Sequence, residues 1–195
     1  DVGSFLVYKN GHPAIIDIGG ATYTRDYGSE WVRDSAYHNL APVIDGEVQI
    51  KGRKYAARNV AFERSEGEVV FSQDFAHAYG EVSGVKKWER IYRHRKGRSI
   101  AIADRYEFAG QPAAISLPMM FQSRPDISSP GQVLIEPAED TRLTIAYDPD
   151  LFDIEFEKIT VEDRSVAGKW GDTLYRLNFV MRKPAKSGEF RFLIE

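Results

Sequence analysis

Residues 88–106 read WERIYRHRKGRSIAIADRY, and this stretch predicts two strands joined by a tight turn. Residues 88–94 place large or apolar side chains at every second position, and residues 100–106 repeat that alternation. The pair Lys96-Gly97 between them is a turn signal, because glycine tolerates the backbone angles of a short hairpin loop. The stretch is therefore typical of an antiparallel hairpin and favours a β-protein.

The same alternation recurs along the whole chain. Further alternating segments are residues 5–8, 48–50, 69–71, 143–147, 174–181 and 190–194. Turn pairs lie between them at hairpin spacing, namely Asn10-Gly11, Asp45-Gly46, Lys51-Gly52, Glu66-Gly67, Pro130-Gly131 and Ser187-Gly188. Eleven Phe, ten Tyr and three Trp suit rings packed between two sheets. We predict an all-β fold, a large antiparallel β-sandwich of the super-sandwich type with little helix.

Length and composition narrow the class of protein. The length of 195 residues suits one domain that spans residues 1–195. The composition, with 43% hydrophobic and 28% charged residues, is that of a globular protein and excludes disordered and fibrous proteins. A formal net charge of -3 provides no field for a phosphate backbone, so no nucleic-acid partner is expected. The sequence also predicts no membrane partner, because it holds no long apolar stretch. Without cysteine, any metal site must use His, Asp or Glu.

Residues 19–39 break the alternation and predict a long ordered loop. The segment is rich in glycine, tyrosine and charged residues, and residues 29–36 are compatible with one helical turn. Loops of this length in compact domains are uncommon unless they are functional. We therefore expect functional residues in this segment.

Asp17 and His38 stand at the two ends of this loop. A carboxylate that directly follows the apolar run 14–16 is costly to bury unless it is paired or coordinates a metal. Asp and neutral His are acceptable zinc ligands, although two ligands do not complete a site. The alternative is that Asp17 pairs with Arg25 or Arg33, or accepts hydrogen bonds from backbone N–H groups.

Residues 86–98 carry seven Lys or Arg and one Glu. They allow two interpretations, a solvated hairpin or a surface for an anionic polymer, and the slightly acidic chain favours the first. Within this run, Trp88, Arg90, Tyr92 and His94 share one face of the predicted strand, which we interpret as the polar face of an amphipathic strand.

The order of several short motifs resembles the β-sandwich part of the heparinase II/III-like polysaccharide lyases. The motifs are residues 1–5 (DVGSF), 15–19 (IIDIG), 23–24 (YT), 37–39 (YHN) and 43–46 (VIDG), followed by a Trp-x-Arg strand before residues 104–106 (DRY). They cover roughly the first 110 residues.

The resemblance implies a division of labour between two domains. In that family an α/α toroid packs on the sandwich, and the cleft between them cleaves uronic-acid-containing polysaccharides by β-elimination. Because the chain begins at Asp1, inside a family motif, we expect an upstream toroid domain to be absent from it and the chain to be inactive alone. The resemblance also implies a bacterial, periplasmic or secreted protein, and a homodimer is one expected assembly.

The resemblance further assigns site residues. Asp17 and His38 match two ligands of a zinc site, whose third ligand is a His two residues before Asp1. The metal would tie the loop that carries His38 to the strand that carries Asp17. Elimination needs a neutralised carboxylate, a base and an acid. The loop offers five cleft candidates for contact with the substrate: Tyr23, Arg25, Tyr27, Arg33 and Asn39.

Two competing hypotheses need no catalysis. In one, the chain is a carbohydrate-binding sandwich whose Trp31, Trp88 and Tyr92 stack on sugar rings. In the other, it is a structural domain that supports the rest of a longer protein. An exposed aromatic platform would favour the first of these, whereas Asp17 and His38 within ligand distance would favour the lyase.

Overall fold

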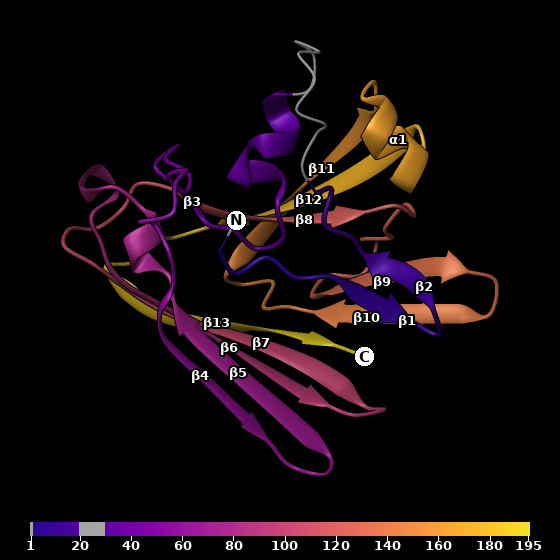
Figure 1. The fold of residues 1–195 in the computed structure, drawn as a ribbon, viewed down its shortest axis with the longest axis horizontal. Coiled ribbons are helices and arrows are strands. Elements are labelled where there is room, and N and C mark those ends of the chain that lie inside the picture. Colours follow the sequence, from indigo (N-terminus) through magenta and orange to yellow (C-terminus); the bar gives the residue numbers. More distant parts are fainter. Residues whose placement is uncertain (1, 20–29) are drawn as a thin grey trace.

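The structure is a computed structural model that describes residues 2–19 and 30–195. Its strands form two main sheets that lie face to face (Figure 1), which confirms the predicted antiparallel β-sandwich. The larger sheet contains, in spatial order, β4 (Arg58–Arg64), β5 (Glu68–Asp74), β6 (Val85–Arg95), β7 (Ser99–Phe108), β13 (Ser187–Ile194), β10 (Thr141–Ala146) and β9 (Gln132–Ala138).

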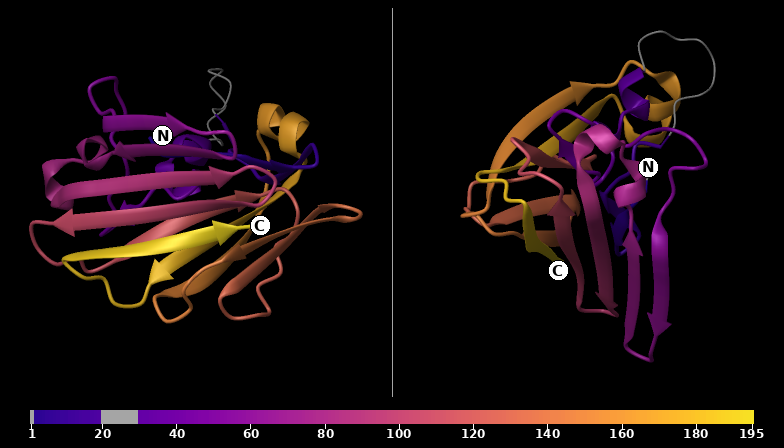
Figure 2. Two further views of the ribbon diagram at one scale, coloured as in Figure 1. Left: turned by 90° about the horizontal axis from the view of Figure 1, so that it is seen from below. Right: turned by 90° about the vertical axis from the view of Figure 1, so that its left-hand side faces the viewer.

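The smaller sheet has four strands. They are, in order, β11 (Phe152–Thr160), β12 (Thr173–Met181), β8 (Ile115–Phe121) and β3 (Val43–Ile44). A separate hairpin joins β1 (Val7–Lys9) to β2 (His12–Ile15) through the predicted turn Asn10-Gly11. All the strand pairs are antiparallel, and Figure 2 shows the strands of the larger sheet side by side.

Helix is scarce in the described residues, as predicted. The α-helix α1 (Arg164–Trp170) begins after Asp163, whose carboxylate accepts hydrogen bonds from the N–H groups of Ser165 and Val166 at 2.9 and 3.0 Å. The other helical segments in these residues are four short 3-10 turns: Glu30–Arg33, Ser35–Tyr37, Ala76–Ala78 and Glu81–Ser83. The first two bear out the helical turn expected near residues 29–36. No helix in residues 2–19 or 30–195 is long and apolar enough to cross a membrane.

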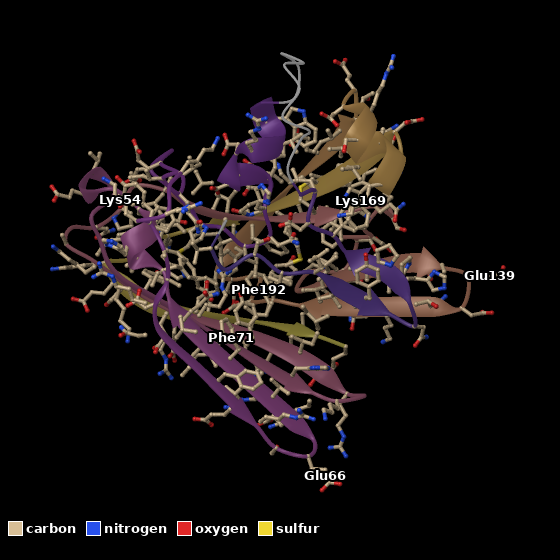
Figure 3. All side chains as sticks on the ribbon, in the orientation of Figure 1. Lys54, Glu66, Phe71, Glu139, Lys169 and Phe192 are labelled. Carbon is tan, nitrogen blue, oxygen red and sulfur yellow. The ribbon has the colours of Figure 1, made fainter. Side chains whose placement is uncertain are left out.

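Two apolar clusters cover both faces of the smaller sheet. The main core lies between the sheets, where Phe192 of β13 is labelled in Figure 3. Its ring centroid lies 4.9 Å from that of Phe179 of β12. A second cluster lies on the other face of the smaller sheet, under α1 and the first two 3-10 turns, and includes Met120, Leu174 and Trp170. Strand β8 therefore contributes to both clusters and is apolar at almost every position.

Two of the predicted elements are wrong. Residues 48–50 form no strand, because the Gln49 side chain binds the backbone of Val2 through two hydrogen bonds of 2.7 and 2.8 Å. Ser187-Gly188 is not a turn but the start of β13, where Gly188 lies opposite Tyr106. The alternation also left β2, β3, β4, β8, β9 and β11 unidentified.

Candidate functional site

The structure brings Asp17 and His38 into contact. Asp17 follows β2 and the buried Ile16, and His38 ends the 3-10 turn Ser35–Tyr37. The Nδ1 atom of His38 lies 3.0 Å from Oδ2 and 3.2 Å from Oδ1 of Asp17. The two ends of the long loop are thus held together at one point.

Two further donors complete the surroundings of the Asp17 carboxylate. The Ser4 hydroxyl donates to Oδ2, and the Gly19 N–H donates to Oδ1 at 2.8 Å. Burial raises the pKa of the Asp17 carboxyl, but the hydrogen bonds from His38, Ser4 and Gly19 and the charge of His38 outweigh it and hold the pKa at about 2. Asp17 is therefore ionised throughout the physiological pH range. Arg33 is not its partner.

The second ring nitrogen of His38 faces a carbonyl. Its Nε2 atom lies 3.2 Å from the backbone oxygen of Val32, and the side chain is buried. Because a carbonyl oxygen can only accept, Nε2 carries a proton in this contact. The other ring nitrogen, Nδ1, faces the Asp17 carboxylate, where it can donate a proton to an oxygen or share a cation with it.

Asp17 and His38 are chemically suitable zinc ligands, but two ligands are too few for a zinc site. Carboxylate oxygen and imidazole nitrogen both bind Zn²⁺, whose sites use three or four protein ligands. Within residues 2–19 and 30–195, no group of three His, Asp or Glu side chains converges on one point. Any third protein ligand would have to come from outside these residues.

Asn39 does not face a cleft, which corrects the expectation that it contacts substrate. Its side chain is fully buried, and its Nδ2 donates to the backbone oxygens of Phe5 at 2.6 Å and Ile16 at 2.7 Å. Its Oδ1 accepts from the N–H of Met120 at 2.8 Å. Asn39 therefore joins three segments of backbone beside His38.

A buried ion pair, which the sequence did not reveal, lies behind this site. Arg90 and Asp104 are both fully buried, and two hydrogen bonds of 2.6 and 2.7 Å join them. Trp88 Nε1 donates to the same carboxylate at 2.8 Å. The face of β6 interpreted as polar is therefore the core face, and that interpretation is wrong because a carboxylate on β7 neutralises the guanidinium.

Arg90 also holds the two segments that carry the site. Its Nη1 donates to the carbonyl of Gly3 at 3.1 Å, and its Nη2 donates to the carbonyl of Leu40 at 2.7 Å. Gly3 directly precedes Ser4, and Leu40 lies two residues after His38. The Trp-x-Arg spacing followed by Asp104 was the available signal for this arrangement.

Arg33 is the cleft candidate that the structure places on an accessible surface. It is exposed, and it lines a groove of about 460 Å³ together with Trp31 and Lys51. The remaining lining residues are Asp34, Ser35, Val48 and Gln49. The groove combines an aromatic ring with two cations, a combination suited to an anionic sugar. The candidates Tyr23, Arg25 and Tyr27 lie outside the described residues.

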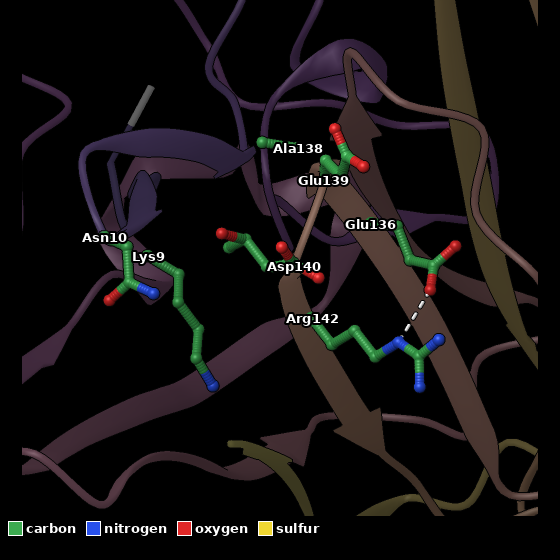
Figure 4. Close-up of a pocket in the computed structure, with 8 residues that line it drawn as sticks. Lys9, Asn10, Glu136, Ala138, Glu139, Asp140 and Arg142 are labelled. Carbon is green, nitrogen blue, oxygen red and sulfur yellow. Dashed lines mark hydrogen bonds and ion pairs between the residues drawn. The ribbon is translucent and has the colours of Figure 1, made fainter.

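A hollow of about 950 Å³ opens elsewhere, between the tips of the β1–β2 and β9–β10 hairpins (Figure 4). Glu136 and Arg142 form an ion pair of 2.7 Å on its wall, and Lys9, Glu139 and Asp140 also line it. Neither Asp17 nor His38 lines it, so it is separate from their site.

The described residues do not support an aromatic platform for sugar. Trp88 is fully buried and stacks on Tyr106 at 5.2 Å, and the Tyr92 hydroxyl donates to the Gly3 carbonyl. Trp31 is half-buried and packs edge-on against Tyr37. Two of the three rings expected to stack on sugar are therefore occupied within the protein.

Comparisons with known proteins agree with this fold. The family model described as heparinase II/III-like, C-terminal, matches residues 1–179. The heparan sulfate lyase HepC of Pedobacter heparinus superposes with a TM-score of 0.76 at 17% identity, over 98% of this chain and 30% of that one. A heparinase III, the BT4657 gene product, gives 0.75 at 13% identity over 98% and 29% of the two chains.

The chain thus spans about 30% of the length of these solved proteins. Another heparinase III structure gives a TM-score of 0.73 at 16% identity, over 98% of this chain and 28% of that one. No curated protein sequence matches the chain.

Proposed function

The chain belongs to the heparinase II/III-like family, whose C-terminal region it matches, and on this premise we propose that it forms the β-sandwich part of a polysaccharide lyase. The proposed reaction is β-elimination in a uronic-acid-containing polysaccharide. The observation that carries the proposal is the contact between Asp17 and His38, which lies within the matched region.

Elimination requires three chemical tasks at one sugar. The uronate carboxylate must be neutralised so that the C5 proton can leave, a base must take that proton, and an acid must protonate the departing C4 oxygen. The described residues contain no group that is placed for all three. We assign the base and the acid to a toroid domain in a longer protein, and to this chain one wall of the cleft.

The groove beside Arg33 is the part of that wall that would bind substrate. Arg33 and Lys51 offer cations for a carboxylate or sulfate, and the Trp31 ring offers an apolar surface for a sugar ring. Tyr23, Arg25 and Tyr27 stay predictions as further contacts from the same loop.

We propose that Asp17 and His38 hold a zinc ion, together with a histidine upstream of Asp1. The ionised carboxylate and the direction of Nδ1 support this assignment. When bound, zinc would supply a fixed positive charge that ties the long loop to the end of β2. The chain's own residues orient it, since Ser4 and Gly19 fix the carboxylate and Val32 fixes the ring.

The test is the ultraviolet absorbance of the unsaturated uronate that elimination produces. The chain of 195 residues is expected to give no rise in absorbance with alginate or heparan sulfate, whereas a longer protein that includes the toroid turns one of them over. Turnover by the 195-residue chain would contradict the division of labour.

Within the longer protein, Asp17→Asn and His38→Gln are expected to lower kcat/KM by more than about tenfold, the range for outer-sphere and ligand changes at metal sites. Elemental analysis should show zinc in the parent protein and less in both variants. The exposed acid Asp153 provides a control, since Asp153→Asn changes the same charge in an ion pair with Arg182 that contains neither site residue. Full activity of both site variants would reject the role of the pair.

Location and assembly stay predictions. We infer a bacterial protein that is exported to the periplasm or secreted, because its substrate would be an extracellular polymer. Fractionation of cells that produce the longer protein would test this. A homodimer is the assembly that we expect, and sedimentation velocity would distinguish it from a monomer.

A further inference from the structure

One exposed loop concentrates positive charge. Residues 48–62 read VQIKGRKYAARNVAF and contain no acidic residue, and they span the end of the β3–β4 loop and the start of β4. Lys51, Arg53 and Lys54 of the loop and Arg58, the first residue of β4, are all exposed. Figure 3 shows Lys54 at one end of the molecule, far from Glu66 at the tip of the β4–β5 hairpin.

Ordered contacts hold this loop against a neighbouring turn. The N–H of Ile50 donates to the carbonyl of Ala78 at 2.8 Å. The Tyr55 ring lies 6.4 Å from the His77 ring, and Arg58 Nη2 donates to His77 Nε2 at 3.0 Å. The cations are therefore presented from a defined base.

These cations have no carboxylate partners among the described residues. Lys51, Arg53, Lys54 and Arg58 take part in no ion pair of residues 2–19 and 30–195. In contrast, Arg93 and Arg95 of β6 share Glu68 of β5. Four neighbouring cations without a counter-charge raise the local potential and attract anions.

The loop also connects two hollows. Lys51 lines the groove beside Trp31, which also contains Asp34. At the other end, Arg58, His77 and Lys86 line a hollow of about 380 Å³. Two acids line this second hollow: Glu81, and Asp74, which accepts hydrogen bonds from the N–H groups of Ala76 and Trp88. Cationic side chains of residues 51–58 thus line both hollows.

We propose that a basic strip, made of Lys51, Arg53, Lys54, Arg58 and Lys86, binds an extended anionic polysaccharide. This inference rests on the proposed function and adds a subsite for sugars remote from the bond that is cut. The chemistry that the strip recognises is a row of sulfate or carboxylate groups along a linear chain. Tyr55, whose ring lies 4.9 Å from the Lys54 ammonium, adds an aromatic surface for a sugar ring.

Fluorescence anisotropy with labelled oligosaccharides tests the strip directly on the 195-residue chain. One arm uses heparan sulfate fragments, which carry sulfate and carboxylate, and the other uses alginate fragments, which carry carboxylate alone. Binding in either arm supports the strip, and the arm that binds more tightly identifies the anion. No binding in either arm at low salt overturns it.

A pair of charge-matched variants separates the strip from general electrostatics. K51Q/R53Q/K54Q/R58Q and the control R98Q/K183Q/K186Q/R191Q each remove four exposed cations, so both lower the formal net charge from -3 to -7. We expect the strip variant to lose affinity by about tenfold or more and the control by less than about threefold. Equal losses overturn the proposal.

Further measurements test whether a loss of affinity comes from unfolding of the variant or from unspecific binding of polyanions. Circular dichroism melts must show that the strip variant folds, and K51R/K54R, which keeps every charge, should bind like the parent protein. Duplex DNA that competes as well as the oligosaccharide would assign the strip to unspecific polyanion binding and overturn the proposal. These assays measure binding and not turnover. Their result can therefore be interpreted even if the longer protein proves not to be a lyase.

Discussion

The guanidinium of Arg90 is fully buried, and its hydrogen-bond partners compensate its charge. Asp104 neutralises it, and the carbonyls of Gly3 and Leu40 accept further hydrogen bonds. A buried ion pair of this kind contributes little net stability compared with apolar residues, but removing one partner leaves an uncompensated charge. The pair therefore fixes the position of the segments around the site.

Asp104→Asn is expected to lower the free energy of unfolding by about 3–5 kcal/mol, because Arg90 would stay buried without a counter-charge. Urea titration measures this. Asp153 forms an exposed ion pair of 2.6 Å with Arg182, so Asp153→Asn should cost less than about 1 kcal/mol. Similar losses for both variants would contradict the role of burial.

Asp17 makes stability depend on pH in the metal-free protein. Its pKa is about 2 in the fold, below the ordinary value of 3.8. A lowered pKa stabilises the fold above the unfolded pKa, and this contribution disappears as the pH falls through the folded pKa. We expect about 2 kcal/mol to be lost between about pH 4 and pH 2 through this group.

Urea titrations across this pH range, in the presence of a chelator, test the effect of Asp17. Asp17→Asn should be less stable at pH 6 and should show a flatter pH dependence below pH 4. Parallel curves for the parent and the variant would mean that Asp17 does not drive the acid response.

Residue-level prediction from sequence reached only part of the site. Asp17 and His38 were recognisable because one follows an apolar run and the other closes a long polar loop. Their contact with each other and the role of Ser4 depend on how the chain folds back, which no local pattern encodes. Asn39 was misread because a polar residue in a polar loop gives no sign that three backbone groups bury it.

At the scale of elements, Gly188 shows why a turn signal can lie inside a strand. A Cβ atom at this position would lie 2.7 Å from the Tyr106 hydroxyl oxygen, so the tyrosine ring of β7 occupies the space of the missing side chain. Glycine in a strand often marks such a close approach. Position 188 thus requires glycine because the Tyr106 ring needs the space, and not because the backbone has a positive φ angle.

Gly188→Ala is therefore expected to destabilise the protein by about 1–3 kcal/mol through overpacking. Gly110 is the control, since a Cβ atom there meets nothing within 4 Å. Thermal melts of both variants decide the question. A neutral Gly188→Ala would mean that Tyr106 moves aside freely.

Strand β8 shows the limit of alternation as a signal. Its two faces enter different apolar clusters, so its sequence ISLPMMF does not alternate. Pro118 argues further against a central strand, yet β3 pairs only with Ile115 and Ser116. On the side of Pro118 the chain instead places Leu40, whose N–H donates to the Pro118 carbonyl at 2.6 Å. The half-exposed hairpin of β6 and β7 was predictable because its faces differ.

At the scale of the molecule, the two apolar clusters share strands. Strand β12 sends Leu177 into the main core and Leu174 into the second cluster, and β8 divides in the same way. Neither cluster can open without loosening a strand that the other needs. The sandwich class was predictable from turns and aromatic content, whereas this sharing depends on which residues of the smaller sheet face α1.

We therefore expect one cooperative unfolding transition. Protein labelled with 5-fluorotryptophan gives three fluorine NMR signals, of which Trp88 reports on the main core and Trp170 on the second cluster once single Trp→Phe variants have assigned them. Both signals should give the same urea midpoint and slope. A lower midpoint for Trp170 would show that the layer under α1 opens first.

The attachment of residues 2–5 has a mechanical consequence. Four successive residues are bound by four different parts of the fold: Val2 by Gln49, Gly3 by Arg90, Ser4 by Asp17 and Phe5 by Asn39. A polypeptide joined upstream of Val2 would therefore connect to a segment that is fixed on the sandwich by hydrogen bonds, and not to a flexible linker. Tension on that junction would act on these four hydrogen bonds together, so residues 2–5 would be released only when several of them break at once.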